Sequence, residues 1–310
     1  MRTQTKVVFG MLTMYIAWGT TYIAIAFAIE SMPDSLAMGL RFLAAAALQF
    51  ALVSATAGVR QFALPRRQLL TALALGALML AMGIGTVSIA EHAVPVAIVA
   101  LIVATMPLWT TVLRLLSRDT PRPAALVGVV IGFAGIAVIM QPGATAPRAG
   151  GAAGAVTALM LLVLLGNLMW SFGSFLTPRL DLPRNALVLT TYEMLSAGAV
   201  LCTVGLVRGQ SVSDVADATA RSWLGWTYLV IVGSVVGYTT YNWLLAHASI
   251  TLVSTYSYVN PVVATVMSVA IFHEPVTRTI AVGGGLVVVS VALVVLAERA
   301  RPVAVSDPVA

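Results

Sequence analysis

The chain has 310 residues, of which 60% are hydrophobic and only 9% are charged, and its mean hydropathy is +0.98. A soluble domain carries about 25% charged residues and 45–50% apolar residues, so this composition excludes a soluble enzyme, a nucleic-acid-binding protein and a disordered chain. The net charge of +6 does not change this conclusion, because the basic residues fall in short loops, where membrane topology places them. With one cysteine (Cys202) and one lysine (Lys6), we expect no disulfide, metal site or cofactor, and no P-loop ATPase.

Ten apolar runs follow one another, each long enough to cross about 30 Å of hydrocarbon with about 20 residues. They cover residues 7–29, 35–57, 68–90, 93–116, 122–141, 151–177, 186–207, 222–246, 249–272 and 277–297. The first run is too long for the apolar part of a signal peptide and lacks a cleavage site, so we interpret it as a retained span. The sequence therefore predicts an all-α polytopic membrane protein with ten transmembrane helices and short connectors.

Orientation follows from lysine and arginine, which accumulate in cytoplasmic loops. With the N-terminus inside, twelve of the 17 basic residues lie on the inner side and four on the outer side, and Arg41 lies within a span. The bias is strong in the first half of the chain and weak in the second. We expect both termini in the cytoplasm.

The two halves of the chain resemble each other at an offset that drifts only from 152 to 155 residues. The matched pairs are Trp18 with Trp170, Arg41 with Glu193, Gly83 with Gly237, Pro107 with Pro261, Gly128 with Gly283 and Gly135 with Ser290. A unit of five spans crosses an odd number of times, so the second unit runs inverted, as in many secondary transporters. We predict one five-helix repeat in residues 1–144, a second, inverted one in residues 145–300, and a cytoplasmic tail in residues 301–310. The alternative is a duplication that only doubled a scaffold.

Seven segments give the chain a specific resemblance. They are WGTTY at 18–22, GLRFLAA at 39–45, EH at 91–92, ATMPL at 104–108, WSFGS at 170–174, EML at 193–195 and SYVNPVV at 257–263. With them, the chain resembles the EamA family of the drug/metabolite transporter superfamily over residues 8–297. The resemblance implies a ten-helix exporter of the bacterial inner membrane, with a central cavity, driven by substrate or proton gradients rather than by ATP. Ala26 stands where many relatives carry Lys or Arg, so no role for a basic residue is expected there.

Two charged residues, Arg41 and Glu193, lie inside spans at matched positions. Arg41 is ~10 Å deep by helix rise, where a cation is costly unless it faces a cavity or a partner; alternatively, its side chain reaches back toward Asp34 or Glu30 at the outer edge. Because an apolar medium favours the neutral form of a carboxyl group, Glu193 is a candidate for proton coupling, the alternative being a permanently protonated group in the bundle. One zwitterionic amino acid could engage both residues.

Glu91 is a second candidate for proton coupling, since with His92 it opens the fourth span at the outer rim. Alternatively, it complements the dipole at a helix N-terminus. Pro107 and Pro261 interrupt spans 4 and 9 at matched positions, each removing a backbone hydrogen bond and kinking its helix. Paired interruptions in two halves indicate a transporter binding site, although single kinks are common.

Aromatic and polar side chains recur four residues apart, which places each pair on one helix face. The pairs are Trp18 with Tyr22, Trp170 with Ser174, Tyr238 with Asn242 and Tyr256 with Asn260. Aromatic rings with polar tips are typical of sites that hold amphipathic organic molecules, although a single ring more often only packs. The predicted substrate-binding residues, in a cavity between spans 1, 3, 4, 6, 8 and 9, are Trp18, Tyr22, Arg41, Asn167, Trp170, Tyr238, Asn242, Tyr256 and Asn260. Glycine-rich spans 5 and 10 serve structure or dimer contact.

These residues indicate a secondary transporter that exports small amino-acid-like or amphipathic metabolites through a central cavity by alternating access. A uniporter or a drug exporter of the same fold is the alternative. An enzyme is disfavoured because the chain has no HExxH or GxSxG motif and no Asp or His embedded in a span, and a pore would need rings of like charge. The expected partners are a small-molecule substrate and the lipid bilayer, with the chain a monomer or homodimer.

Overall fold

The computed structural model describes residues 3–141 and 153–299, and within these ranges every regular element is a helix. Eight helical segments are long and apolar enough to cross a membrane, namely Gln4–Ala28, Asp34–Ala57, Arg66–Ala90, Val96–Leu116, Gly154–Arg179, Ala186–Val207, Ala220–His247 and Arg278–Ala297. Two shorter apolar helices, Pro123–Ile139 and Val259–Phe272, occupy the places of predicted spans 5 and 9. The prediction of an all-α polytopic membrane protein is confirmed.

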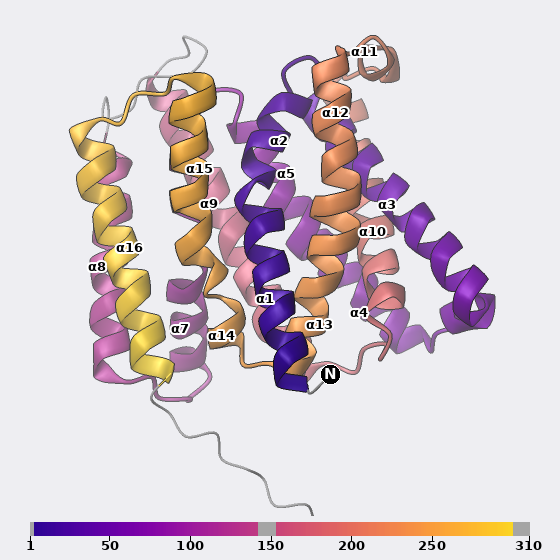
Figure 1. Cartoon of the computed structure of the whole chain (residues 1–310), viewed down its shortest axis with the longest axis horizontal. Helices are drawn as coiled ribbons and strands as arrows, with labels where there is room; N and C mark the ends of the chain where they lie inside the picture. Colours follow the sequence, from indigo (N-terminus) through magenta and orange to yellow (C-terminus); the bar gives the residue numbers. More distant parts are fainter. Residues whose placement is uncertain (1–2, 142–152, 300–310) are drawn as a thin grey trace, which may run out of the picture.

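The helices run up and down side by side, and α1 begins on the face where α16 ends (Figure 1). The first half contains α1 (Thr3–Gly19), α2 (Thr21–Ala28), α3 (Asp34–Ala57), η1 (Val59–Phe62), α4 (Arg66–Leu75), η2 (Gly76–Ile84), α5 (Gly85–Ala90), α6 (Val96–Val103), α7 (Met106–Leu116) and α8 (Pro123–Ile139). The second half contains α9 (Ala153–Leu176), η3 (Thr177–Arg179), α10 (Ala186–Val207), α11 (Val212–Ala216), α12 (Ala220–Tyr228), η4 (Leu229–Tyr238), α13 (Thr239–His247), α14 (Ile250–Val253), α15 (Tyr256–Phe272) and α16 (Arg278–Arg299). Large apolar side chains such as Ile16, Val130 and Leu206 stay exposed on the outer faces, as contact with lipid requires.

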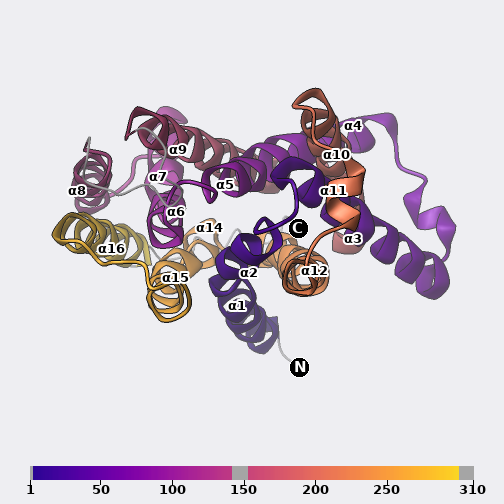
Figure 2. The same cartoon turned by 90° about the horizontal axis from the view of Figure 1, so that it is seen from above.

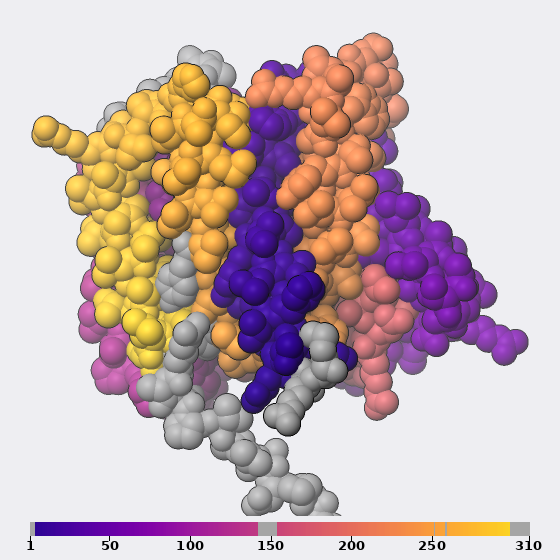
Figure 3. Space-filling model, viewed as in Figure 1, coloured from indigo at the N-terminus to yellow at the C-terminus, as the bar shows by residue number. Residues whose placement is uncertain are grey.

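Seen from above, α8 and α16 lie together at one end of the molecule, and α3, α4 and α10 lie at the other (Figure 2). On the face shown in Figure 3, α1 lies between α15 and the segment formed by α12, η4 and α13. Glycines bring α8 and α16 close: a Cβ at Gly135 would come within 2.8 Å of the Gly283 carbonyl oxygen, and one at Gly128 within 2.9 Å of the Ser290 carbonyl oxygen. These glycine faces therefore pack on each other within one chain.

Spans 4 and 9 are both broken, but not at matched positions. Span 4 breaks at Ala104–Thr105, and Pro107 follows in the first turn of α7, where its missing N–H leaves no helical bond unmade. Span 9 breaks at Ser254–Thr255, whereas Pro261 lies further on, inside α15. The interruption predicted at Pro107 is thus a break just before the proline, and Pro261 is the one that removes a bond from a helix interior.

Spans 3 and 8 each contain a stretch of π-helix, η2 and η4. The two stretches fall at the same place in the two halves, because Gly83 in η2 and Gly237 in η4 are a matched pair at offset 154. π-helix is rare and is found frequently at functional sites. Both stretches lie along the central cavity described next.

Candidate functional site

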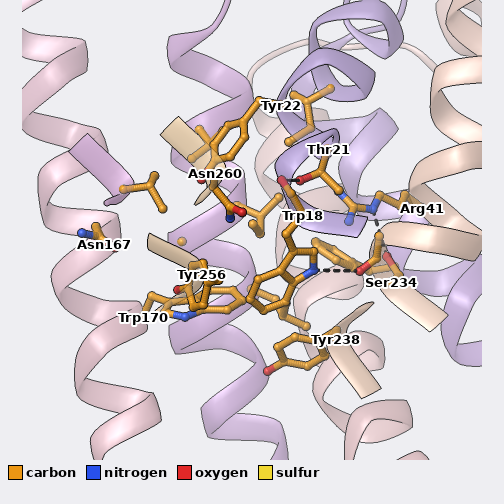
Figure 4. A pocket seen from close by; sticks show the side chains of 18 residues that line it. Trp18, Thr21, Tyr22, Arg41, Asn167, Trp170, Ser234, Tyr238, Tyr256 and Asn260 are labelled. Atoms are coloured by element: carbon orange, nitrogen blue, oxygen red, sulfur yellow. Dashed lines mark hydrogen bonds between the residues drawn. The ribbon is translucent and has the colours of Figure 1, made fainter. Parts of the chain in front are cut away.

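A cavity with about 680 Å³ of empty space, part of it open to the outside, lies between the two halves of the chain. Its lining residues come from α1, α2 and α3, from η2, α5 and α6, and from α9, η4 and α15 (Figure 4). These elements belong to spans 1, 3, 4, 6, 8 and 9, as predicted, and also to span 2. Spans 5, 7 and 10 contribute no residue to the described lining.

Eight of the nine predicted substrate-binding residues line this one cavity. They are Trp18, Tyr22, Arg41, Asn167, Trp170, Tyr238, Tyr256 and Asn260. The ninth, Asn242, lies instead on a separate hollow between η3, α10 and α13, together with Arg184, Trp243 and His247. The structure therefore brings together side chains from both halves of the chain that the sequence singled out, and it adds Thr21, Phe42 and Ser234 to the same wall.

Aromatic rings form a tight cluster at one end of the cavity, and Figure 4 shows Trp170, Tyr256 and Trp18 in a row. The Trp18 ring lies 5.6 Å from that of Trp170, 4.9 Å from that of Tyr241 and 5.1 Å from that of Tyr256, centroid to centroid. Fully buried Tyr241 does not line the cavity, and it belongs to α13, beyond the cavity-lining end of η4. The cluster thus lies on the side of the cavity toward the face at which α1 begins.

Tyr241 is the residue that sequence reasoning missed. Its hydroxyl group lies 2.6 Å from the Ser174 hydroxyl and accepts a hydrogen bond from Trp170 Nε1 at 3.2 Å. A signal was present, because Tyr241 follows Tyr238 by three residues and so shares its side of the helix. Only the packing of α9 against α13 shows that it ties the Trp170–Ser174 pair in place.

The matched tryptophans pack on glycines of the π-helical stretches, each in the opposite half. A Cβ at Gly237 would lie 2.7 Å from Trp18 Nε1, and a Cβ at Gly83 would lie 2.9 Å from Trp170 Cε3. Trp18 Nε1 also donates a hydrogen bond to the Gly233 carbonyl oxygen at 3.3 Å. Only glycine fits beneath either indole ring without a shift.

Arg41 is buried, with 3% of its surface exposed, and it lines the cavity. Its Nε donates a hydrogen bond to Ser234 Oγ at 2.9 Å, and its guanidinium carbon lies 4.9 Å from the centre of the Phe42 ring. The alternative that Arg41 reaches back to the outer edge is wrong. Asp34 pairs there with Arg208 at 2.5 Å and with His92 at 3.3 Å, and Glu30 pairs with Arg221 at 3.5 Å.

Glu193 has 0% of its surface exposed and does not line the cavity. Its Oε2 accepts a hydrogen bond from Asn242 Nδ2 at 2.7 Å, and the Tyr238 hydroxyl group faces the carboxyl group from the cavity wall. At Gly76, a Cβ would collide with the Glu193 carbonyl oxygen, so η2 and α10 are in backbone contact. Arg41 and Glu193 therefore do not face one cavity. The expected zwitterion bridge is absent from this structure because Asn242 holds the carboxyl group behind the wall.

Glu91 ends the third span rather than opening the fourth. It follows α5 and bonds through its backbone N–H to the Val87 carbonyl oxygen at 3.0 Å, while α6 begins only at Val96, after Pro95. The interpretation of Glu91 as an acidic residue at a helix N-terminus is therefore wrong, because the proline starts the helix later than the apolar run suggests. The side chain is buried near Tyr22, outside the described cavity lining.

Apolar helices that cross a membrane around an aromatic cavity shared by both halves of the chain define a polytopic membrane transporter. The model of the EamA-like transporter family matches the chain twice, over residues 5–141 and 157–296. The "Uncharacterized inner membrane transporter YedA" of Escherichia coli (strain K12) is 35% identical over 297 residues, which are 95% of this chain and 92% of that protein. The chain belongs to the EamA-like transporter family, in the drug/metabolite transporter superfamily, and is YedA-like.

Two further similarities are weaker. The "Uncharacterized transporter YvbV" of Bacillus subtilis (strain 168) is 23% identical over 180 residues, which are 58% of this chain and 56% of that protein. One solved crystal structure of a protein matches with a TM-score of 0.67, covering 96% of this chain and 99% of that chain. At 22% sequence identity, that match shows a likeness of fold alone.

Proposed function

We propose that the protein is a secondary transporter of the bacterial inner membrane that exports small amino-acid-like or amphipathic metabolites by alternating access. The observation that carries this proposal is the convergence of eight residues, from both halves of the chain, on one cavity. Its walls are mostly aromatic and aliphatic, with a few amide and hydroxyl groups and one cation. Walls of this kind hold drug-sized organic molecules and orient them through the few polar groups.

We further propose that the chain forms two inverted five-helix repeats, residues 1–144 and 145–300, followed by the tail 301–310. The contacts described above support this arrangement because they are reciprocal. The tryptophan of each half packs on the π-helical glycine of the other, and Gly128 meets Ser290 as Gly135 meets Gly283. A twofold axis in the membrane plane produces such paired contacts. In this arrangement α8 and the α14–α15 segment also cross the membrane, which gives ten spans.

Topology reporters test the arrangement directly. Fusions of a reporter at residues 62 and 310 are expected to report the cytoplasm, and a fusion at residue 215 the periplasm. The opposite pattern would overturn the proposal that both termini are cytoplasmic. The same side for the equivalent residues 62 and 215 would overturn the inverted repeat.

The aromatic cluster suggests how access alternates. It lies on the side of the cavity toward the face where α1 begins, and we propose that opening toward that face requires the Trp18 and Trp170 rings to part. Because each ring rests on a glycine of η4 or η2, we propose that bending of these π-helical stretches moves the rings.

We propose Glu193 as the group that couples transport to protons, acting through the wall rather than by direct contact with substrate. Tyr238 lies between Glu193 and the cavity, while Asn242 lies between Glu193 and the hollow at the end of α13. The carboxyl group thus stands between two spaces. Buried Glu91 is the second candidate. A uniporter of the same fold would have the same cavity without a proton role for Glu193.

The test is counterflow in proteoliposomes that contain the purified protein, with labelled amino acids and related amphipathic compounds, with and without a pH gradient. Saturable exchange of chemically unchanged compound is the expected result, with protein-free liposomes as the control. Flux that never saturates would indicate a pore, and chemical conversion of the compound would indicate an enzyme; either result would overturn the proposal.

A further inference from the structure

We propose that the cavity recognises its substrate by a single negative charge. Arg41 binds a carboxylate or an equivalent anionic group, the apolar body of the substrate packs against the aromatic cluster, and the described lining holds no acidic side chain to pair with an ammonium group. This inference rests on the proposed transport function and narrows its substrate class to small organic anions with an apolar body.

Arg41 is the one charged residue in the described lining of the cavity. Within residues 3–141 and 153–299, no carboxylate lies within 4.0 Å of its guanidinium group. A buried cation in a membrane protein is costly unless it is paired or faces a water-filled cavity. A substrate anion would supply the missing counter-charge.

The guanidinium nitrogens of Arg41 differ in their partners. Nε is occupied by Ser234 Oγ, but Nη1 reaches only the Met38 sulfur, at 3.5 Å, and sulfur is a weak acceptor. Nη2 lies against Gly233, where a Cβ would come within 2.9 Å of it. In the described part of the chain, no oxygen is bonded to either Nη atom. Two such nitrogens present parallel N–H groups in the fork that binds a carboxylate through both oxygens.

The acidic groups nearest the cavity all lie outside its described lining. Glu193 is behind Tyr238 and is bonded to Asn242, Glu91 is buried near Tyr22, and Asp34 pairs with Arg208 at the rim. The acceptors left on the cavity wall are neutral. Asn167 Oδ1 and Asn260 Oδ1 have no hydrogen-bond partner among the described residues. They suit a hydroxyl or amine N–H of the substrate, but they carry no charge to select an ammonium group.

Figure 4 shows Arg41 and Asn167 on opposite sides of the cavity, with Trp18 and Tyr256 between them. A molecule held at Arg41 by its anionic group therefore lays its body across the rings. Ser234, which holds Nε, fixes the direction from which the guanidinium group meets it.

Matched ligands can separate the contributions of the carboxylate, the amino group and the apolar body to binding. Phenylalanine, 3-phenylpropanoate and 2-phenylethylamine share one body and differ only in the amino and carboxyl groups; leucine, 4-methylpentanoate and 3-methylbutylamine form the aliphatic equivalent. Binding to the purified protein is measured by tryptophan fluorescence, since Trp18 and Trp170 line the cavity. In at least one series, we expect the two carboxylates to bind within about threefold of each other and the amine at least tenfold more weakly.

Variants at the site give the second measurement. Arg41→Gln is expected to weaken the binding of both carboxylates at least tenfold and to leave the binding of the amine unchanged. Arg41→Lys restores part of the loss, and Gly233→Ala, which displaces Nη2 but keeps the charge, falls between wild type and Arg41→Gln. The matched control is Arg221→Gln, which removes an exposed arginine paired with Glu30 and leaves binding unchanged. If Arg41→Gln does not fold, Ser234→Ala takes its place, because it removes the group that holds Nε of Arg41. It is expected to weaken the binding of both carboxylates and to leave the binding of the amine unchanged.

Three outcomes would overturn the inference: an amine that binds as well as its carboxylate, a zwitterion that binds far better than the carboxylate alone, or carboxylate binding that survives Arg41→Gln. Binding that depends on Arg41 without any counterflow in proteoliposomes would support the inference and overturn the transport function. Counterflow of amines that is unchanged by Arg41→Gln would overturn the inference and support the transport function.

Discussion

Arg41 on α3 and Glu193 on α10 occupy matched positions in the two halves, and their surroundings differ. Arg41 faces η4, where Gly233 and Ser234 leave room for its guanidinium group to reach the cavity. Glu193 faces η2 so closely that the backbones touch at Gly76, and Asn242 bonds to its carboxyl group.

The difference shows how two matched positions of one chain can have different surroundings. The same helix position, packed against the same kind of π-helical stretch in the opposite half, carries a cation that faces the cavity in one case and a carboxyl group enclosed in the wall in the other. The proposed roles follow from this: Arg41 contacts substrate, and Glu193 acts through its neighbours.

The variant with the largest expected effect disrupts the contact between Gly76 and the backbone of Glu193. Gly76→Ala places a methyl group against the backbone of α10, which cannot move aside, so we expect a loss of about 3 kcal/mol of stability and poor recovery of monodisperse protein in detergent. Gly233→Ala meets mainly side-chain atoms, among them the flexible end of Arg41, so its cost in stability is small. Thermal melting of the two variants measures the difference.

Gly285→Ala is the control for adding a methyl group to a helix, because nothing lies within 4 Å of a Cβ there. If Gly76→Ala and Gly233→Ala melt at the same temperature, the helix packing around Glu193 is no tighter than that around Arg41.

The second prediction separates the proposed roles of the two charges. Glu193→Gln keeps the shape and a hydrogen-bonding tip but cannot release a proton. We expect substrate exchange within about twofold of wild type and no accumulation driven by a pH gradient, because coupling needs a group that changes its protonation state. Counterflow and gradient-driven uptake in the same proteoliposome preparation measure the two quantities.

Undiminished pH-driven accumulation in Glu193→Gln would make Glu193 structural and would move the coupling site, if one exists, to Glu91. Loss of exchange as well as of accumulation would show that Glu193 supports the fold of the wall rather than coupling.

The third prediction tests the wall that faces Arg41. Tyr256→Ala and Asn260→Ala remove a ring of the aromatic cluster and an amide of the lining, and each should lower the transport rate about tenfold while folded protein remains in the membrane. Leu206→Ala, on an exposed outer face, is the control. Wild-type rates in both cavity variants would show that these side chains serve packing alone.

Much of this site could be predicted from the sequence, for a physical reason. Membrane spans repeat at a known length, and aromatic residues four positions apart share a face, so Trp18, Tyr22, Tyr256 and Asn260 were found without tertiary information. Asn242 shows the limit. It lies one turn beyond Tyr238, past the level of the cavity, so sharing a face with Tyr238 did not place it in the lining.

The π-helical stretches could not be predicted, because reading the sequence at 3.6 residues per turn assumes an α-helix throughout. Tyr241 was missed since its role depends on the partner that α9 presents, Ser174. Glu91 was placed in the wrong span because the apolar run at 93–116 is continuous through Pro95, and only the backbone shows where the helix restarts.

The smallest expected effects come from two single hydroxyl groups, and they sharpen the comparison of the charged sites. Tyr238→Phe keeps the ring in the cavity wall but removes the hydroxyl group that faces Glu193. Tyr241→Phe removes the hydroxyl group that bonds to Ser174 and Trp170.

If Glu193 communicates with the cavity through Tyr238, pH-driven accumulation should fall about threefold in Tyr238→Phe while exchange is unchanged. Tyr241→Phe should instead lower stability by about 1 kcal/mol, the worth of a typical hydrogen bond, and leave the ratio of accumulation to exchange as in wild type. That ratio, measured for both variants, is the deciding quantity. Equal ratios in the two variants would mean that the hydroxyl group beside Glu193 has no special part in coupling and that Tyr238, like Tyr241, serves the aromatic cluster alone.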